Sequence, residues 1–145
     1  MQQPDTERAI GYLVKRVQQS LRRRCDSVLR PTGLSMAQYA ALRALADHPD
    51  ASAAELARLC FVTRQSLGDL LAGLRSAGLV ADTDTPRRGR AQSLTLTRLG
   101  RTRLAAAHSA VSDVEAAMTA GIQTQLRDDV SLALTRCAEN LEKYE

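Results

Sequence analysis

The apolar residues of this chain recur mainly at steps of three and four, the spacing of helices that bury one face. The first such stripe predicts an amphipathic helix from about Thr6 to Leu29, stopped by Pro31 and Gly33. Its apolar positions are Ile10, Leu13, Val14, Val17, Leu21 and Val28.

Two serines mark the expected starts of the next two helices. Ser35 precedes Gln38 by three residues, and Ser52 precedes Glu55 by the same interval. This is the spacing of a capping box, in which the serine hydroxyl and the later side chain satisfy each other's free amides. Short helices are therefore predicted after both serines.

A fourth helix is predicted after a tight bend at residues 61–62, with Thr63 as its cap. Gly78 stands where a left-handed residue commonly ends a helix. The inward face of this helix is expected to be built from Leu67, Leu70, Leu71 and Leu74.

The period then changes to two, which indicates a β-hairpin. Leu79–Thr83 and Gln92–Leu96 read as short strands. The loop between them holds a proline, a glycine and three arginines, Arg87, Arg88 and Arg90.

Two further helical stripes fill the rest of the chain, separated by Gly121. The first steps by threes and fours in a heptad-like seam. Its members are Leu104, Ala107, Val111, Val114 and Met118. The second consists of Leu126, Val130, Leu134, Cys137 and Leu141. The fold class is therefore mainly α with a small β-hairpin, and the helix–bend–helix–hairpin order is that of a winged helix-turn-helix.

Charge strengthens this interpretation. The net charge is +4, but residues 58–103 hold nine arginines against three aspartates, while residues 104–145 are acidic. A basic centre confined to one module is typical of a nucleic-acid-binding surface.

The helix after the bend can enter a DNA major groove, which admits one α-helix. With its leucines turned inward, its first turns present Arg64, Gln65, Ser66 and Asp69 as base-reading candidates. Thr63 and the neighbouring free amides suit a phosphate. Arg87, Arg88 and Arg90 suit a narrow minor groove. The capping residues Ser35, Gln38 and Ser52 are further predicted DNA contacts. Taken alone, Arg64 and Gln65 would read as a solvated helix face; the bend before them and the basic hairpin after them favour DNA.

Other function classes find little support. The chain shows no nucleophile elbow, paired-carboxylate site, phosphate-binding glycine loop or metal-ligand cluster, so neither an enzyme nor a cofactor is expected. No apolar run approaches the ~20 residues of a membrane span. We expect a cytoplasmic protein without metal. A winged helix used only for protein contacts is the rival interpretation, and the three arginines of the hairpin loop argue against it.

The sequence resembles the MarR family of bacterial regulators. The resemblance rests on LA-x5-T-x3-L-x2-LL-x2-L-x3-GLV from Leu56, then PRRGRA, then LTLT-x2-G ending at Gly100, and on GLS-x2-QY from Gly33. It implies a single domain over 1–145, with the winged helix-turn-helix lobe at 34–100 and dimerisation helices at 6–30 and 101–145. It further implies a homodimer that binds a pseudo-palindromic operator in double-stranded DNA, often as a repressor released by a small phenolic or anionic ligand or by cysteine oxidation.

The chain departs from the family pattern in three places. The wing of relatives resembles D-P-R-D-R-R, whereas this chain has Thr85 and Arg88 at the two acidic positions. Gly73 and Asp82 stand where the family commonly has a basic residue. The chain therefore lacks the acidic residues that would order the wing in relatives and two of the basic residues that would contact phosphates.

The resemblance leaves two kinds of switch open. A ligand site is predicted between the dimer helices and the lobe, at Tyr12, Tyr39 and His108. For redox sensing, Cys25 lies beside three arginines, which would favour its thiolate. Cys25, Cys60 and Cys137 nevertheless follow or adjoin the apolar stripes, so all three are expected to be small core residues.

Overall fold

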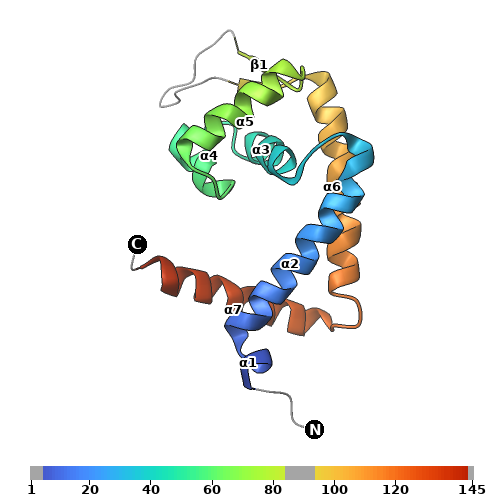
Figure 1. Cartoon of the computed structure of the whole chain (residues 1–145), viewed down its shortest axis with the longest axis vertical. Coiled ribbons are helices and arrows are strands. Elements are labelled where there is room, and N and C mark those ends of the chain that lie inside the picture. Colours follow the sequence, from blue (N-terminus) through green and yellow to red (C-terminus); the bar gives the residue numbers. More distant parts are fainter. Residues whose placement is uncertain (1–4, 84–93, 144–145) are drawn as a thin grey trace. The chain divides into compact units, whose positions relative to one another are not determined.

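The computed structural model describes residues 5–83 and 94–143 (Figure 1). The chain divides into two compact units between Val114 and Glu115. The predicted wing residues Arg87, Arg88 and Arg90 lie outside the described residues. Unit 1 comprises α1 (Asp5–Arg8), α2 (Ile10–Leu29), the 3-10 turn η1 (Arg30–Thr32), α3 (Met36–Asp47), α4 (Ala53–Leu59), α5 (Arg64–Ser76), β1 (Val80–Asp82), β2 (Leu94–Leu96) and most of α6 (Arg98–Met118). Unit 2 holds the end of α6 and α7 (Thr124–Glu142). The predicted fold class and order of elements are confirmed.

The first predicted helix is divided. Ala9 has an extended backbone (φ −65°, ψ 138°) and separates the single turn of α1 from α2. The expectation of one continuous helix from Thr6 was therefore wrong at its first turn, because apolar periodicity begins only at Ile10 and carries no information about residues before it.

The predicted caps are formed at the starts of α3 and α4. The Ser35 hydroxyl accepts from the Gln38 amide at 3.1 Å, and the Gln38 side chain accepts from the Ser35 amide at 3.0 Å, which completes the capping box. The Ser52 hydroxyl accepts from the Glu55 amide at 3.1 Å, which forms one half of the second predicted box.

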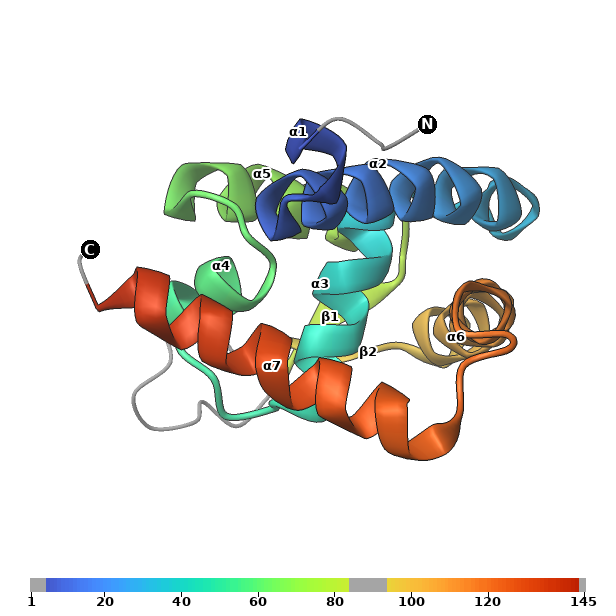
Figure 2. The ribbon, with the colours of Figure 1, turned by 90° about the horizontal axis from the view of Figure 1, so that it is seen from below.

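The helix α3 is the centre of unit 1, where it contacts α2, α4, α5 and β2 (Figure 1, Figure 2). Its residues Ala41, Leu42 and Leu45 are buried. The helix α5 adds Leu67, Leu71 and Leu74, while Leu70 is only partly buried. Burial of a leucine side chain contributes about 1.5–3 kcal/mol, so this shared core determines which face α5 turns outward.

The first strand of the hairpin, β1, is shorter than the sequence predicts. β1 pairs antiparallel with β2 in the register Val80 to Leu96, and Leu79 is buried just before β1. Gly78 has φ 74° and ends α5 as expected. The described strands span three residues each, against the five expected, and residues 92–93 lie outside the described chain.

Thr97 and Gly100 fasten the start of α6 to the start of the hairpin. The Thr97 amide donates to the Leu79 carbonyl at 3.0 Å, and its hydroxyl donates to the Gly78 carbonyl at 2.6 Å. The same hydroxyl accepts from the Gly100 amide at 3.0 Å. A Cβ on Gly100 would lie 2.0 Å from the Leu79 carbonyl oxygen, so only glycine fits this approach. These contacts explain the last threonine and the glycine of the LTLT-x2-G motif, which are Thr97 and Gly100.

The terminal helices leave apolar faces uncovered. In α6, Ala107, Val111 and Val114 are buried as predicted, whereas Met118 is 45% exposed. The helix α7 has no buried residue, and Leu126, Val130, Leu134 and Leu141 are exposed. On α2, Ile10, Leu13, Val14 and Val17 are exposed.

Cys137 corrects a prediction. It was expected in the core, but it is exposed, because it lies on the α7 stripe and nothing in the described chain covers that stripe. Within residues 5–83 and 94–143, no helix has the length and hydropathy needed to cross a membrane.

The close approach at Gly100 predicts a pair of opposite stability effects. Gly100→Ala should lower the free energy of unfolding by about 1–3 kcal/mol, because the added methyl must displace the Leu79 backbone. Gly73→Ala, within α5 and with nothing within 4 Å of the new Cβ, should raise it by about 0.5–1 kcal/mol. Urea unfolding at one fixed protein concentration measures both, and a Gly100→Ala variant as stable as Gly73→Ala would contradict the assignment.

Candidate DNA interface and adjoining polar cleft

The start of α5 is an ordered, capped helix N-terminus on the surface of unit 1. Thr63 is the N-cap, with an extended backbone, and its hydroxyl accepts from the Ser66 amide at 3.0 Å. The same hydroxyl donates to the Ser66 hydroxyl at 3.0 Å. The cap leaves the amides of Arg64 and Gln65 outside the helical ladder, an arrangement that suits an anion.

The predicted base-reading side chains of α5 are all exposed. They project from the first two turns of α5, while Leu67, Leu71 and Leu74 of the same helix are buried, so no apolar contact is lost if they enter a groove. Arg can bond guanine through two hydrogen bonds, Gln can do the same with adenine, and a carboxylate accepts from cytosine. These residues are Arg64, Gln65, Ser66 and Asp69. The structure confirms their placement; their contact with DNA stays a prediction.

Ser35, Gln38 and Ser52 have a local structural role. Their polar atoms close the starts of α3 and α4, as described above. Each is exposed or half-buried, so contact with a phosphate at these two helix starts also stays a prediction.

An ion pair lies at the described base of the hairpin. Arg75, in the last turn of α5, donates to the Asp82 carboxylate at the end of β1, with 3.0 Å between nitrogen and oxygen. Both side chains are well exposed, so the pair contributes at most about 1 kcal/mol. It explains how an acidic residue is accommodated at position 82: the carboxylate neutralises a nearby arginine of the same surface.

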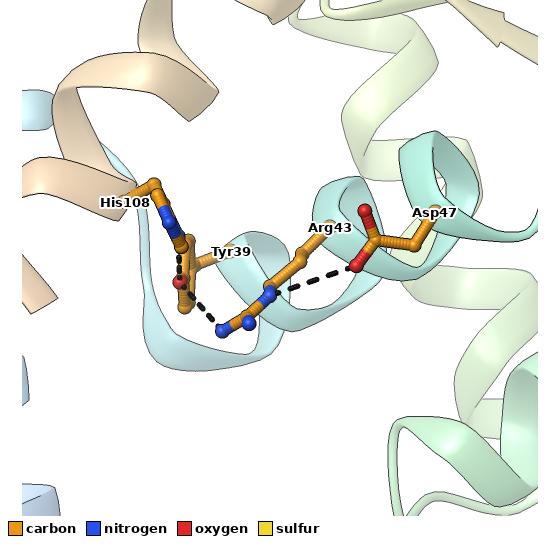
Figure 3. Close-up of polar contacts among 4 residues, drawn as sticks. All are labelled: Tyr39, Arg43, Asp47 and His108. Carbon is orange, nitrogen blue, oxygen red and sulfur yellow. Dashed lines mark hydrogen bonds and ion pairs between the residues drawn. The ribbon is translucent and has the colours of Figure 1, made fainter. Parts of the chain in front are cut away.

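Four polar residues of α3 and α6 form a chain of contacts (Figure 3). The hydroxyl of Tyr39 lies 3.1 Å from Nδ1 of His108, and Arg43 donates to the Tyr39 oxygen at 3.2 Å. Nε of Arg43 lies 3.7 Å from a carboxylate oxygen of Asp47. Because Arg43 can only donate, the set is satisfied when the Tyr39 hydroxyl donates to an unprotonated Nδ1 of His108. The Nε2–H of His108 is then a donor.

This chain borders a cleft of about 440 Å³ within unit 1. Its lining combines apolar side chains with two arginines and a histidine, against one carboxylate. The lining residues are Arg43, Ala46, Asp47, Leu96, Arg101, Leu104, Ala105 and His108. An apolar floor beside convergent cationic donors is suited to a small organic anion.

The sequence predicted only part of this cleft. Tyr39 and His108 are brought together, as expected, but Tyr39 is 4% exposed and acts from behind the cleft rather than lining it. Arg43 and Arg101 were missed. Arg43 lies four residues after Tyr39 and four before Asp47, so the helical i,i+4 spacing was the available signal.

Tyr12 lies elsewhere. It lines a separate cavity of about 520 Å³ on α2, together with Lys15, Arg16, Gln19, Ser20 and Arg23. The described chain therefore does not bring Tyr12 into the cleft bordered by His108. A ligand contact by Tyr12 stays a prediction.

The three cysteines differ in their access to solvent. Cys25 is fully buried in the core, and burial raises the pKa of the half-buried Cys60 thiol, which lowers its thiolate fraction. Cys137 is exposed. Among the described residues, no group of three or more His, Cys, Asp or Glu side chains is arranged to hold a metal ion.

Comparison with known proteins agrees with this geometry. Residues 32–91 match the model of the MarR family. The HTH-type transcriptional repressor Rv2887 of Mycobacterium tuberculosis is 37% identical over 111 residues, which cover 77% of this chain and 80% of that protein.

Solved structures extend the similarity to the fold. The M. tuberculosis MarR family protein Rv2887 in complex with salicylic acid aligns with a TM-score of 0.71 and 32% identity, covering 89% of this chain and 96% of that one. Its complex with DNA aligns with a TM-score of 0.70 and 31% identity, covering 89% and 97%. The transcriptional regulator PA3341 aligns with a TM-score of 0.82 and 29% identity, covering 93% and 99%.

Proposed function

Because this chain belongs to the MarR family of transcriptional regulators, we propose that it is a sequence-specific double-stranded DNA-binding repressor that a small ligand releases. The observation that carries the proposal is the exposed first turn of α5. This turn holds the Thr63 cap, two free amides and two exposed side chains suited to base reading, Arg64 and Gln65, on a helix anchored by the buried Leu67, Leu71 and Leu74. Rv2887, named a repressor and crystallised with DNA, supports it.

The protein acts by binding rather than by catalysis, in the cytoplasm where its operator lies. Its candidate DNA-reading side chains are gathered at the start of α5. Among residues 5–83 and 94–143, no group of three or more His, Cys, Asp or Glu side chains is arranged to hold a metal ion. The wing arginines Arg87, Arg88 and Arg90 add minor-groove contacts in this proposal, on the strength of their sequence alone.

The active form is a homodimer. The exposed apolar residues of α2 and α7 recur at helical spacing, which is not typical of a helix face that stays in water. A second copy of the chain would bury both stripes in a symmetric interface. A two-fold dimer places two α5 helices about one DNA turn apart, ~34 Å, which matches a pseudo-palindromic operator.

The ligand is a small organic anion with an aromatic ring, held in the cleft between α3, β2 and α6. Arg43 and Arg101 supply charge, His108 supplies an N–H donor, and Leu96 and Leu104 supply the apolar wall. The complex of Rv2887 with salicylic acid supports this class of ligand. Oxidation of Cys25 and Cys60 is disfavoured, because Cys25 is enclosed and Cys60 has a raised pKa, which leaves the exposed Cys137 as the accessible thiol. Ligand release is proposed because of the cleft.

Removal of the Arg64 side chain tests the DNA interface. Arg64→Ala should weaken binding to a duplex selected from a random pool by about 1–3 kcal/mol and relax the sequence preference. Arg136→Ala removes one positive charge from α7 and should leave both unchanged, since Arg136 is 74% exposed and pairs loosely with Glu139. Fluorescence anisotropy across a salt series measures both variants. Wild-type binding that does not weaken with salt would refute a DNA-binding role.

A charge placed on the α7 stripe tests the dimer. Leu134→Glu should dissociate the homodimer at micromolar concentration, because it buries a carboxylate in the interface. Leu132→Glu is the matched control: Leu132 is 70% exposed on the same helix but off the stripe, so its variant should stay dimeric. Sedimentation velocity gives the oligomeric state, and equal behaviour of the two variants would exclude α7 from the interface.

A charge-removing substitution tests the cleft. Arg43→Met should weaken salicylate binding about tenfold or more, since a hydrogen bond to a charged group contributes about 1.5–3 kcal/mol. Arg98→Met, an exposed arginine on α6 outside the cleft lining, is the control and should bind like wild type. Calorimetric titration with sodium salicylate measures the affinity. If Arg43→Met bound salicylate as tightly as wild type, the ligand would not bind in this cleft.

A further inference from the structure

Phe61, in the turn between α4 and α5, combines two unfavourable features. Its side chain is 96% exposed, more than any other large hydrophobic side chain of the described residues. Its backbone has φ 56°, and among the described residues it is the only non-glycine residue with a positive φ. An exposed aromatic ring contributes little to the core, and a left-handed backbone conformation is strained for a bulky residue such as phenylalanine.

The turn itself explains the conformation but not the residue. The Phe61 amide donates to the Arg58 carbonyl at 3.2 Å, and the Val62 amide donates to the Ala57 carbonyl at 3.0 Å. These bonds close α4 and turn Val62 toward the core, which leaves Phe61 pointing outward. Glycine or asparagine would adopt the same backbone with less strain. The ring is therefore not required for folding, and its presence points to a contact outside the chain.

The surroundings of Phe61 indicate the kind of partner. It lies two residues before the Thr63 cap and is flanked along the chain by Arg58 and Arg64, both exposed. Residues 58–68 contain these two arginines and no carboxylate. A projecting ring with an exposed arginine on each side of it along the chain favours a polyanion that also offers apolar surface. Duplex DNA does so through its deoxyriboses and its thymine methyl groups.

We propose that Phe61 is a DNA-contacting residue that packs its ring against a thymine methyl group or a deoxyribose beside the groove entered by α5. This inference rests on the proposed DNA-binding function and adds an apolar contact to the polar ones of Arg64 and Gln65. The contact contributes shape and methyl recognition without charge.

The test compares three substitutions of Phe61 in the full chain. Phe61→Gly and Phe61→Asn remove the ring and suit the left-handed backbone, so their melting temperatures should equal or exceed that of wild type. Their affinity for a duplex selected by wild type should fall about tenfold, the loss expected when a buried aromatic ring is removed. Phe61→Leu should keep most of the affinity. Leu99→Ala, an exposed leucine on α6, is the control that should bind like wild type.

Two readouts identify the contact as apolar and locate it. The slope of log K against log salt should be the same for wild type and Phe61→Gly, because no phosphate contact is lost. With deoxyuridine in place of thymidine, a methyl contact lowers wild-type affinity and spares Phe61→Gly, whereas a deoxyribose contact leaves the loss on substitution unchanged. Either pattern supports the proposal.

Three outcomes overturn it. Wild-type affinity in Phe61→Gly and Phe61→Asn, while Arg64→Ala binds weakly, refutes the Phe61 contact and leaves the DNA-binding function standing. The same affinity together with lost repression in cells assigns the ring to a protein partner instead. Failure of wild type itself to bind any selected duplex refutes the contact and the proposed function together.

Discussion

The orientation of α5 depends on the burial of its leucine face against α3. Leu67, Leu71 and Leu74 recur at helical spacing and together contribute several kcal/mol, which no exposed polar contact of that helix can match. Rotation of α5 about its axis would expose these leucines and bury Gln65 and Asp69. The hydrophobic core therefore decides which side chains the protein offers to DNA, and the Thr63 cap then decides where their helix begins.

The helix α6 is joined to the same lobe at two places. At its start, Thr97 and Gly100 hold it against Gly78 and Leu79, where α5 passes into the hairpin. Further along, His108 hydrogen-bonds Tyr39 of α3. The cationic cleft lies between these two attachments. In the proposed function, a ligand in this cleft contacts both α3 and α6. Because α5 packs on α3, such a ligand acts directly on the elements that position α5.

Periodicity, caps and turn residues predicted most of this fold, because the local rules agreed with one another. The spacing of residues along the chain predicted three of its features: the capping box at Ser35, the left-handed Gly78 and the leucine face of α5. What could not be read depended on contacts between distant segments or on surfaces completed outside the chain. The interruption at Ala9 has no periodic signal, and the exposure of Cys137 reflects an apolar stripe that no part of the described chain covers. The cleft was half predicted, since its arginines look like ordinary surface charges until α3 and α6 are brought together.

In the proposed complex, a dimer presents two α5 helices to successive turns on one face of the DNA. Hydroxyl-radical footprinting on a duplex selected from a random pool tests it most directly. We expect two protected segments whose centres lie one helical turn, ~10 base pairs, apart on a pseudo-palindromic sequence, with protection lost as salt rises. A single protected segment, or protection on a sequence without two-fold symmetry, would contradict it.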